Sequence, residues 1–297
     1  MERLDAVLAH IDANLEPALE RLFALLRIRS ISTDPAYAAE CRACAEWHVA
    51  DLAGIGFAAT AHATRGHPIV VGHARQGSGP SALFYGHYDV QPADPLDLWD
   101  HDPFEPKIET RADGTRVIRA RGASDDKGQV QTFVEACRAW KAVTGSLPIP
   151  ITVLLEGEEE SGGVNLPPFL KAHAAELKAD IGLICDTGMW DTATPAIVTM
   201  LRGLCGEEVT IHAADRDLHS GLFGSAAANP NRVLARILAD LHDVDGRVTL
   251  AGFYDGVPEL SNALRTQWDT LGFDAGAFLG AIGLSEPAGE RGRSALE

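Results

Sequence analysis

The feature of this chain that most constrains its fold is a series of short apolar segments separated by helix-like segments. The apolar segments cover residues 68–74, 81–87, 115–120, 149–157, 179–185 and 196–200. Between them, residues 128–143 and 166–178 show the apolar spacing of amphipathic helices. Strands that alternate with helices predict an α/β fold, in which a mostly parallel, mixed sheet is flanked by helices.

A different pattern begins near Gly203. Residues 206–214 alternate in polarity like a strand with one solvated face, and residues 229–243 have the pattern of an amphipathic helix. We therefore expect two domains. The first covers 1–205, and the second, an α+β domain, covers 206–297.

The charge of the chain limits its partners. Lys and Arg number 25 and Asp and Glu number 42, so the formal net charge is -17. We expect no binding to nucleic acid or to an anionic membrane, whereas cations suit such a chain. The sequence also has no apolar run of membrane-spanning length.

The cysteines favour a cytoplasmic protein with reduced thiols. There are 5 of them, an odd number scattered over predicted helices and strands. Cys41 and Cys44 have the spacing of a zinc or redox motif, but they lie within a helical pattern. We expect both to pack in the core, where free cysteine is common.

Residue types that bind metals follow several of the predicted strands. They are His87 and Asp89, the run Glu158–Glu160, Asp186, and the pair Asp125 and Asp126 before a predicted helix. If these strands are neighbours in a parallel sheet, the side chains converge at its carboxyl edge, where ligands bind in such folds.

His87 and Asp89 are two positions apart on an extended segment. Their side chains therefore point the same way, and the carboxylate can orient the imidazole while the imidazole binds a metal. The alternative is a pair on a surface loop. Asp125 has an alternative too, because acidic residues before a helix often cap it; Gly122 and Gly128 would permit the tight backbone that a bridging carboxylate needs.

The glutamates can have different roles. A turn after the strand can direct Glu160 to a metal, leave Glu159 uncoordinated as a base for a metal-activated water, and place Glu158 in solvent. The alternative is an acidic turn without function.

The motifs GHYDVQP, RGASDDKG, LEGEEESGG, CDTGMW and DLHSGLFG together resemble the M20 family of metallopeptidases, and in particular its carnosinase-like dipeptidases. The resemblance implies a zinc-peptidase-like catalytic domain over 1–205 and an inserted lid and dimerisation domain that begins at 206. It also implies hydrolysis of dipeptides or short peptides by a hydroxide that bridges two metal ions. A sister activity, the hydrolysis of N-acyl amino acids, is the alternative.

The resemblance assigns the metal ligands as His87, Asp125, Glu160 and Asp186, with Asp125 bridging both ions. Asp89 would orient His87, and Glu159 would be the general base. The ligands suit zinc, and also manganese or cobalt.

His219, in DLHSGLFG, resembles a lid histidine that reaches the active site of the partner in a homodimer, where it would stabilise the oxyanion of the substrate. From the residues alone it is a histidine in a loop. Family members continue past the point that matches Glu297, so we expect a C-terminally truncated chain that lacks the last metal-ligand histidine. The remaining alternative is an inactive or weakly active metal-binding fragment.

Overall fold

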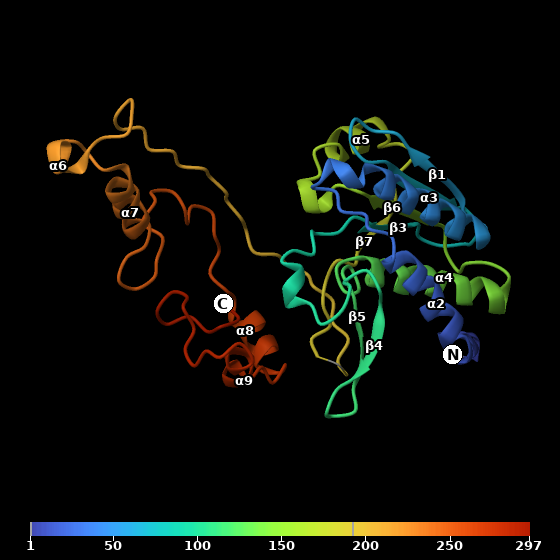
Figure 1. Cartoon of the computed structure of the whole chain (residues 1–297). Coiled ribbons are helices and arrows are strands. Elements are labelled where there is room, and N and C mark those ends of the chain that lie inside the picture. The colour runs from blue at the N-terminus through green and yellow to red at the C-terminus, as the bar shows by residue number, and fades with distance from the viewer. Residues whose placement is uncertain (1, 192) are drawn as a thin grey trace. The chain divides into compact units, whose positions relative to one another are not determined.

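The computed structural model describes residues 2–191 and 193–297 (Figure 1). It divides into two compact units, Met1–Met200 and Leu201–Glu297. The boundary expected after residue 205 lies within an irregular segment that begins the second unit.

The first unit is built on a five-stranded sheet with the order β1-β2-β6-β3-β7. Its strands are β1 (Ala58–His62), β2 (Ile69–Ala74), β3 (Ala82–His87), β6 (Ile151–Glu156) and β7 (Ile181–Ile184). β6, β3 and β7 are parallel to one another, whereas β1 and β2 are antiparallel to their neighbours. The predicted mixed α/β sheet is confirmed.

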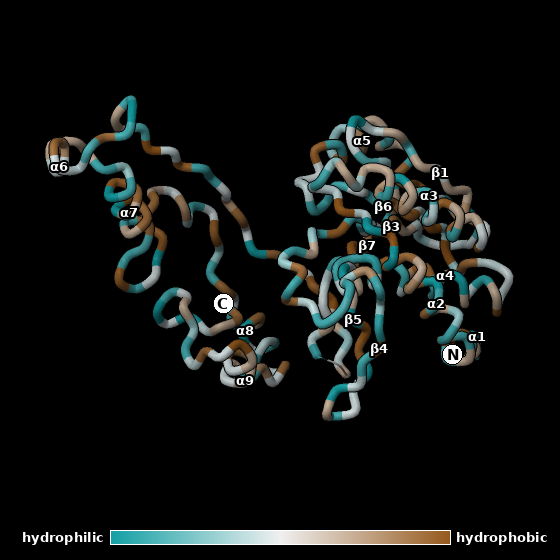
Figure 2. The backbone as a smooth tube through the Cα atoms, viewed as in Figure 1, coloured by the Kyte–Doolittle hydropathy of each residue, from teal (hydrophilic) through white to brown (hydrophobic). Residues whose placement is uncertain are grey.

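Helices cover both faces of this sheet, because successive side chains along each strand point to opposite faces. On one face, Phe84 and Val153 pack in a core with residues of α2 (Leu15–Leu26), α3 (Ala38–Gly54) and α4 (Lys127–Thr144). On the other face, Leu154 packs against Phe169 of α5 (Leu166–Ala172). The central strands are apolar along their length (Figure 2).

Two further elements complete the first unit. The helix α1 (Glu2–Ala13) contacts α4, and a separate antiparallel pair is formed by β4 (Lys107–Thr110) and β5 (Arg116–Arg119). Cys41 and Cys44 lie on α3 and are fully buried in the core, as predicted. No helix of the described residues is long and apolar enough to cross a membrane.

The second unit contains short helices and no named strand among its described residues. The helices are α6 (Ser220–Phe223), α7 (Pro230–Asp240), α8 (Asn262–Asp269) and α9 (Ala275–Gly280). The strand expected at 206–214 is not formed, nor is the one expected at 196–200, at the end of the first unit. A strand needs a neighbour to pair its backbone groups, and neither segment has one in the part of the chain that the structure describes.

Candidate metal centre

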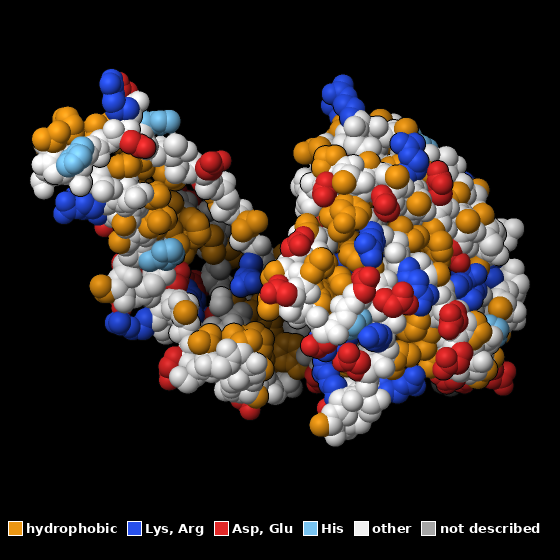
Figure 3. All heavy atoms as spheres, in the orientation of Figure 1, with side chains coloured by type: hydrophobic (Ala, Val, Ile, Leu, Met, Phe, Trp, Pro, Cys, Tyr) orange, Lys and Arg blue, Asp and Glu red, His pale blue; other side chains and the backbone are white. Residues whose placement is uncertain are grey.

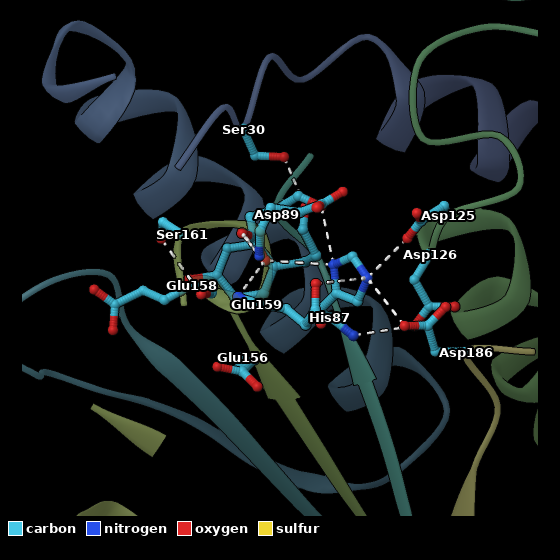
Figure 4. A network of polar contacts seen from close by, with 12 residues as sticks. Ser30, His87, Asp89, Asp125, Asp126, Glu156, Glu158, Glu159, Ser161 and Asp186 are labelled. Atoms are coloured by element: carbon cyan, nitrogen blue, oxygen red, sulfur yellow. Dashed lines mark hydrogen bonds and ion pairs between the residues drawn. The ribbon is translucent and has the colours of Figure 1, made fainter. Parts of the chain in front are cut away.

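The carboxyl ends of β3 and β6, the residues after β7 and the loop before α4 meet at one edge of the sheet (Figure 4). His87, the last residue of β3, is fully buried at the centre of this group. Its Nε2 lies 3.0 Å from Asp125 Oδ1 and 3.7 Å from Asp186 Oδ2. The predicted convergence of these three side chains is therefore present.

These three residues lie close enough together to hold one metal ion. One ligand atom from each of His87, Asp125 and Asp186 lies within 4.8 Å of the other two. Asp125 and Asp186 are partly open to solvent, with side-chain exposures of 63% and 34%. An imidazole nitrogen with two carboxylate oxygens is a donor set that suits zinc, manganese or cobalt.

Asp89 holds His87 from the other side of the imidazole ring. Its carboxylate is fully buried, with Oδ1 3.4 Å from His87 Nδ1, and its backbone oxygen is 3.1 Å from the same nitrogen. The same carboxylate accepts hydrogen bonds from the backbone N–H groups of Glu159 and Glu160, at 3.3 and 3.0 Å. Asp89 thus joins the end of β3 to the turn after β6.

The charge balance around His87 favours a cation. Burial lowers the pKa of His87, but the hydrogen bond with Asp89 and the charges of Asp89, Asp126 and Glu159 outweigh burial and raise it to about 10. Acidic groups that hold a proton this firmly on an imidazole also stabilise a divalent ion there, once the ion displaces the proton. The residues present therefore fit a metal ion.

Glu159 lies beside the group without joining it. It begins the short 3-10 helix Glu159–Ser161, and its Oε2 is 4.0 Å from His87 Nε2. Burial raises the pKa of Glu159, and the charges of Asp186, Asp89 and Asp125 act in the same direction, against that of His87. A carboxylate with a raised pKa can both take up and release a proton during a reaction near neutral pH.

Glu160 is not part of the three-residue group. Its Oε2 accepts a hydrogen bond of 2.6 Å from Gln91 Nε2, so this carboxylate is held by a neighbouring side chain. Its assignment as a ligand stays a prediction.

Glu158, which we expected in solvent, is partly buried and hydrogen-bonded. Its Oε2 accepts a hydrogen bond of 2.6 Å from Asn165 Nδ2, and its Oε1 accepts one of 3.4 Å from the backbone of His67. The chain after β6 turns at once, so Glu158 points back over the loop before β2 while Glu159 is the more exposed member. Glu158 stabilises these two loops.

The backbone before α4 directs Asp125 and Asp126 to different places. Asp125 faces His87, and Asp126 occupies the N-cap position of α4 without a capping hydrogen bond from its side chain. The N-cap position that was the alternative for Asp125 is therefore occupied by Asp126, not by Asp125. Gly128 is required here, because a Cβ at this position would lie 2.0 Å from the backbone oxygen of Ala123.

Sequence reasoning gave no role to two buried acids near the site. Asp126 is fully buried, and burial raises its pKa to about 7. Glu156, at the end of β6, is buried and accepts a hydrogen bond from the Tyr85 hydroxyl. The available signal was Glu156 itself, a charged residue that ends an otherwise apolar strand.

His219 lies in the second unit, outside this group. It is the N-cap residue of α6, and its Nδ1 accepts a hydrogen bond of 3.0 Å from Gly221 N. The predicted role of His219 toward a partner subunit stays a prediction.

Histidine and carboxylates that converge at the carboxyl edge of an α/β sheet could hold a metal ion. The chain matches the model of peptidase family M20/M25/M40 over residues 83–274 and belongs to this family. The resemblance inferred from the motifs is thereby confirmed.

Similar proteins include metallopeptidases of several organisms. The chain is 30% identical over 295 residues to the Cys-Gly metallodipeptidase of Schizosaccharomyces pombe, covering 94% of this chain and 61% of that protein. An M20 family metallo-carboxypeptidase from Sulfolobus solfataricus superposes with a TM-score of 0.76 at 31% identity, over 91% of this chain and 60% of that one. Human carnosine dipeptidase 1 gives a TM-score of 0.75 at 25% identity, over 96% and 62%. The chain thus spans between 60% and 62% of the length of these proteins.

Proposed function

We propose that this protein hydrolyses dipeptides or short peptides with free ends in a metal-dependent reaction. The observation that carries the proposal is the group formed by His87, Asp125 and Asp186, with Glu159 beside it. Membership of the peptidase family supports the same reaction, and a similar protein is a metallodipeptidase.

His87, Asp125 and Asp186 would hold one divalent ion, and Asp125 would share a second ion with Glu160. Zinc suits these ligands, with manganese or cobalt as alternatives. A bound divalent ion would polarise the scissile carbonyl and make water more acidic.

The residues of the chain supply the proton transfers and the orientation. Glu159 would take the proton from the attacking water and deliver it to the leaving amine, as its position and its raised pKa allow. Asp89 would keep the imidazole of His87 in one tautomer and one orientation through the contacts on Nδ1.

We further propose that the protein acts as a homodimer in the cytoplasm, with His219 of one subunit serving the site of the other. The resemblance of DLHSGLFG to lid motifs supports this role of His219. The cytoplasmic location is supported by the free cysteines Cys41, Cys44, Cys137, Cys185 and Cys205.

A substrate panel tests the proposed reaction. The protein is freed of metal, reloaded with zinc, manganese or cobalt, and incubated with dipeptides, tripeptides and N-acetyl amino acids. We expect release of amino acids from dipeptides only after reloading, and no release with His87→Ala. Hydrolysis of N-acetyl amino acids but not of dipeptides would favour the alternative, an N-acyl amino acid substrate. No turnover of any substrate by the metal-loaded protein would contradict the proposal.

A further inference from the structure

We propose that Asp126 is a positioning residue of the metal site. Its carboxylate accepts a hydrogen bond from the His87 backbone N–H, which has no strand carbonyl as a partner. This inference rests on the proposed function, because it concerns the residue that would bind the metal. The contact that motivates it is a hydrogen bond of 3.1 Å from the His87 backbone N–H to Asp126 Oδ2, in a region that is fully buried.

The sheet explains why this N–H needs a side chain as its partner. Along a strand, successive backbone N–H groups point to opposite neighbours. The N–H of Tyr88 donates at 2.9 Å to the backbone oxygen of Glu156, the last residue of β6. The N–H of His87 therefore points to the opposite side, toward β7. The ladder between β3 and β7 has already ended, with the pair Tyr85 and Ile184. The carboxylate of Asp126 therefore takes the place of a strand carbonyl.

The early end of β7 lets the chain after it place Asp186 near His87. Because the chain leaves the ladder after Ile184, Asp186 is free to turn toward the imidazole, and its Oδ2 lies 3.7 Å from His87 Nε2. If β7 continued in register, the residues after Ile184 would pair with β3 instead. Asp126 thus allows β3 to extend to His87 while the segment after β7 supplies a ligand-type side chain.

The local packing leaves space for this carboxylate. A Cβ at Gly86 would lie 2.8 Å from Asp126 Oδ2 and 2.5 Å from Val130 Cγ2, so a larger residue at 86 would displace the acid or the first turn of α4. The absence of a side chain at Gly86 therefore leaves room for the Asp126 carboxylate.

Stability alone does not explain a carboxylate here. Asp126 is 0% exposed, and its Oδ1 has no hydrogen-bond partner among the described residues. A buried carboxylate with an unpaired oxygen is costly, whereas an apolar residue of similar size would avoid the cost of burying a polar group. A role in placing His87 accounts for the acceptor at this position.

Two substitutions separate the acceptor from the charge. Asp126→Asn keeps an oxygen that can accept from His87 N–H and removes the charge, whereas Asp126→Ala removes the acceptor. The matched control is Gln131→Ala, because Gln131 is also a buried polar residue of α4 with one oxygen that has no partner among the described residues.

The measurements are amide hydrogen exchange at His87 and zinc affinity, with thermal unfolding as a check of folding. In the wild type, the His87 amide is expected to be protected even though β7 has ended, and a rapidly exchanging amide would overturn the proposal. Asp126→Ala should lose this protection and about 10- to 100-fold in zinc affinity, the range typical of residues that orient a ligand. Asp126→Asn should keep the protection and should lose clearly less zinc affinity than Asp126→Ala, because it removes the charge but keeps the acceptor. Gln131→Ala should lower the unfolding temperature without changing either readout.

The outcomes distinguish this proposal from the proposed function. If the wild type binds no zinc through His87, the proposed metal site fails, while exchange at the His87 amide still tests the hydrogen bond. If the wild type binds zinc and Asp126→Ala binds it equally well, the positioning role is wrong. If Asp126→Asn loses as much affinity as Asp126→Ala, the charge matters rather than the acceptor, and the proposal is overturned.

Discussion

The two units of this chain differ in how they bury apolar side chains. The first unit has a sheet with apolar residues on both faces, each covered by helices. In the second unit, Leu279 is the only buried apolar residue among those described, while Leu204 and Val244 are 98% and 90% exposed. Apolar side chains are visible on the surface of this unit around α7 (Figure 3).

The difference shows that apolar content alone does not make a core. A sheet gathers apolar residues from distant parts of the chain into layers, and the site in the first unit lies at the edge of such a sheet. The second unit has short helices without a strand to pack on in its described residues. An exposed apolar surface of this kind is typical of a region that binds another protein surface, which agrees with the proposed homodimer.

The strongest test of this contrast substitutes one phenylalanine in each unit. Phe84 is fully buried and stacks on Phe133 with ring centroids 4.0 Å apart, whereas Phe253 is 48% exposed. We expect Phe84→Ala to lower the free energy of unfolding by about 3–5 kcal/mol because it leaves a cavity. Phe253→Ala should change it by less than about 1 kcal/mol. Urea unfolding followed by circular dichroism measures both, and equal losses would show that the two units are packed alike.

Metal binding should stabilise the first unit alone. Zinc at about 100 times its dissociation constant should add about 2.7 kcal/mol to the free energy of unfolding, because only the folded site binds it. Hydrogen exchange in β3 and β6 should slow accordingly, and exchange in α7 and α8 should not change. His87→Ala should remove the effect. Equal slowing in both units would mean that zinc binds elsewhere or couples them.

Limited proteolysis should also distinguish the two units, by their rates of cleavage. Segments with few buried contacts open more often, so we expect cleavage within 201–297 to be at least about tenfold faster than within 1–200. The fragments are identified by mass spectrometry over a time course. First cleavages within β3 or β6 would contradict the assignment of the stable core.

The smallest expected effect concerns the bridge that Glu176 forms with two histidines on the α5 face of the first unit. Glu176 is hydrogen-bonded to His173 and His73, and these bonds lower its pKa to about 2. A carboxyl whose pKa is lower in the folded state stabilises the fold above its unfolded pKa, and this contribution disappears as the pH falls toward about 2.

Glu176→Gln should therefore destabilise the protein by less than about 1 kcal/mol near pH 6, since the pair is partly exposed. The difference from the wild type should shrink below about pH 4.5, the ordinary range of a glutamate. Denaturant unfolding at several pH values measures it, with the exposed Glu46→Gln as the control. A difference that grows as the pH falls would contradict the assigned bridge.

Much of the first unit could be predicted because its strands are apolar and its site residues follow them directly. The strands β3 and β6 lie within the predicted segments, and His87, Asp125 and Asp186 converge as the parallel arrangement requires. The hydrogen-bond partners of Glu158 and Glu160 could not be predicted, because a turn decides where each side chain points. Their partners, Asn165 and Gln91, are polar residues that no sequence pattern links to the glutamates.

The second unit was harder to predict for a related reason. Residues 206–214 alternate like a strand, but a strand forms only when another strand pairs with it, and alternation does not reveal the partner. Asp126 was named beside Asp125 but given no role. The sequence does not show that β7 ends before His87, and this early end is what leaves the His87 N–H for the Asp126 carboxylate.

The most direct test of the central claim is the turnover number of Glu159→Gln on a dipeptide, measured on protein loaded with metal. The substitution keeps the shape of the side chain and removes its ability to take up a proton. We expect kcat to fall by about 100- to 10,000-fold, the usual contribution of a general base, while the metal content and the unfolding temperature match the wild type. A near-normal kcat with full metal content would contradict the account of this site.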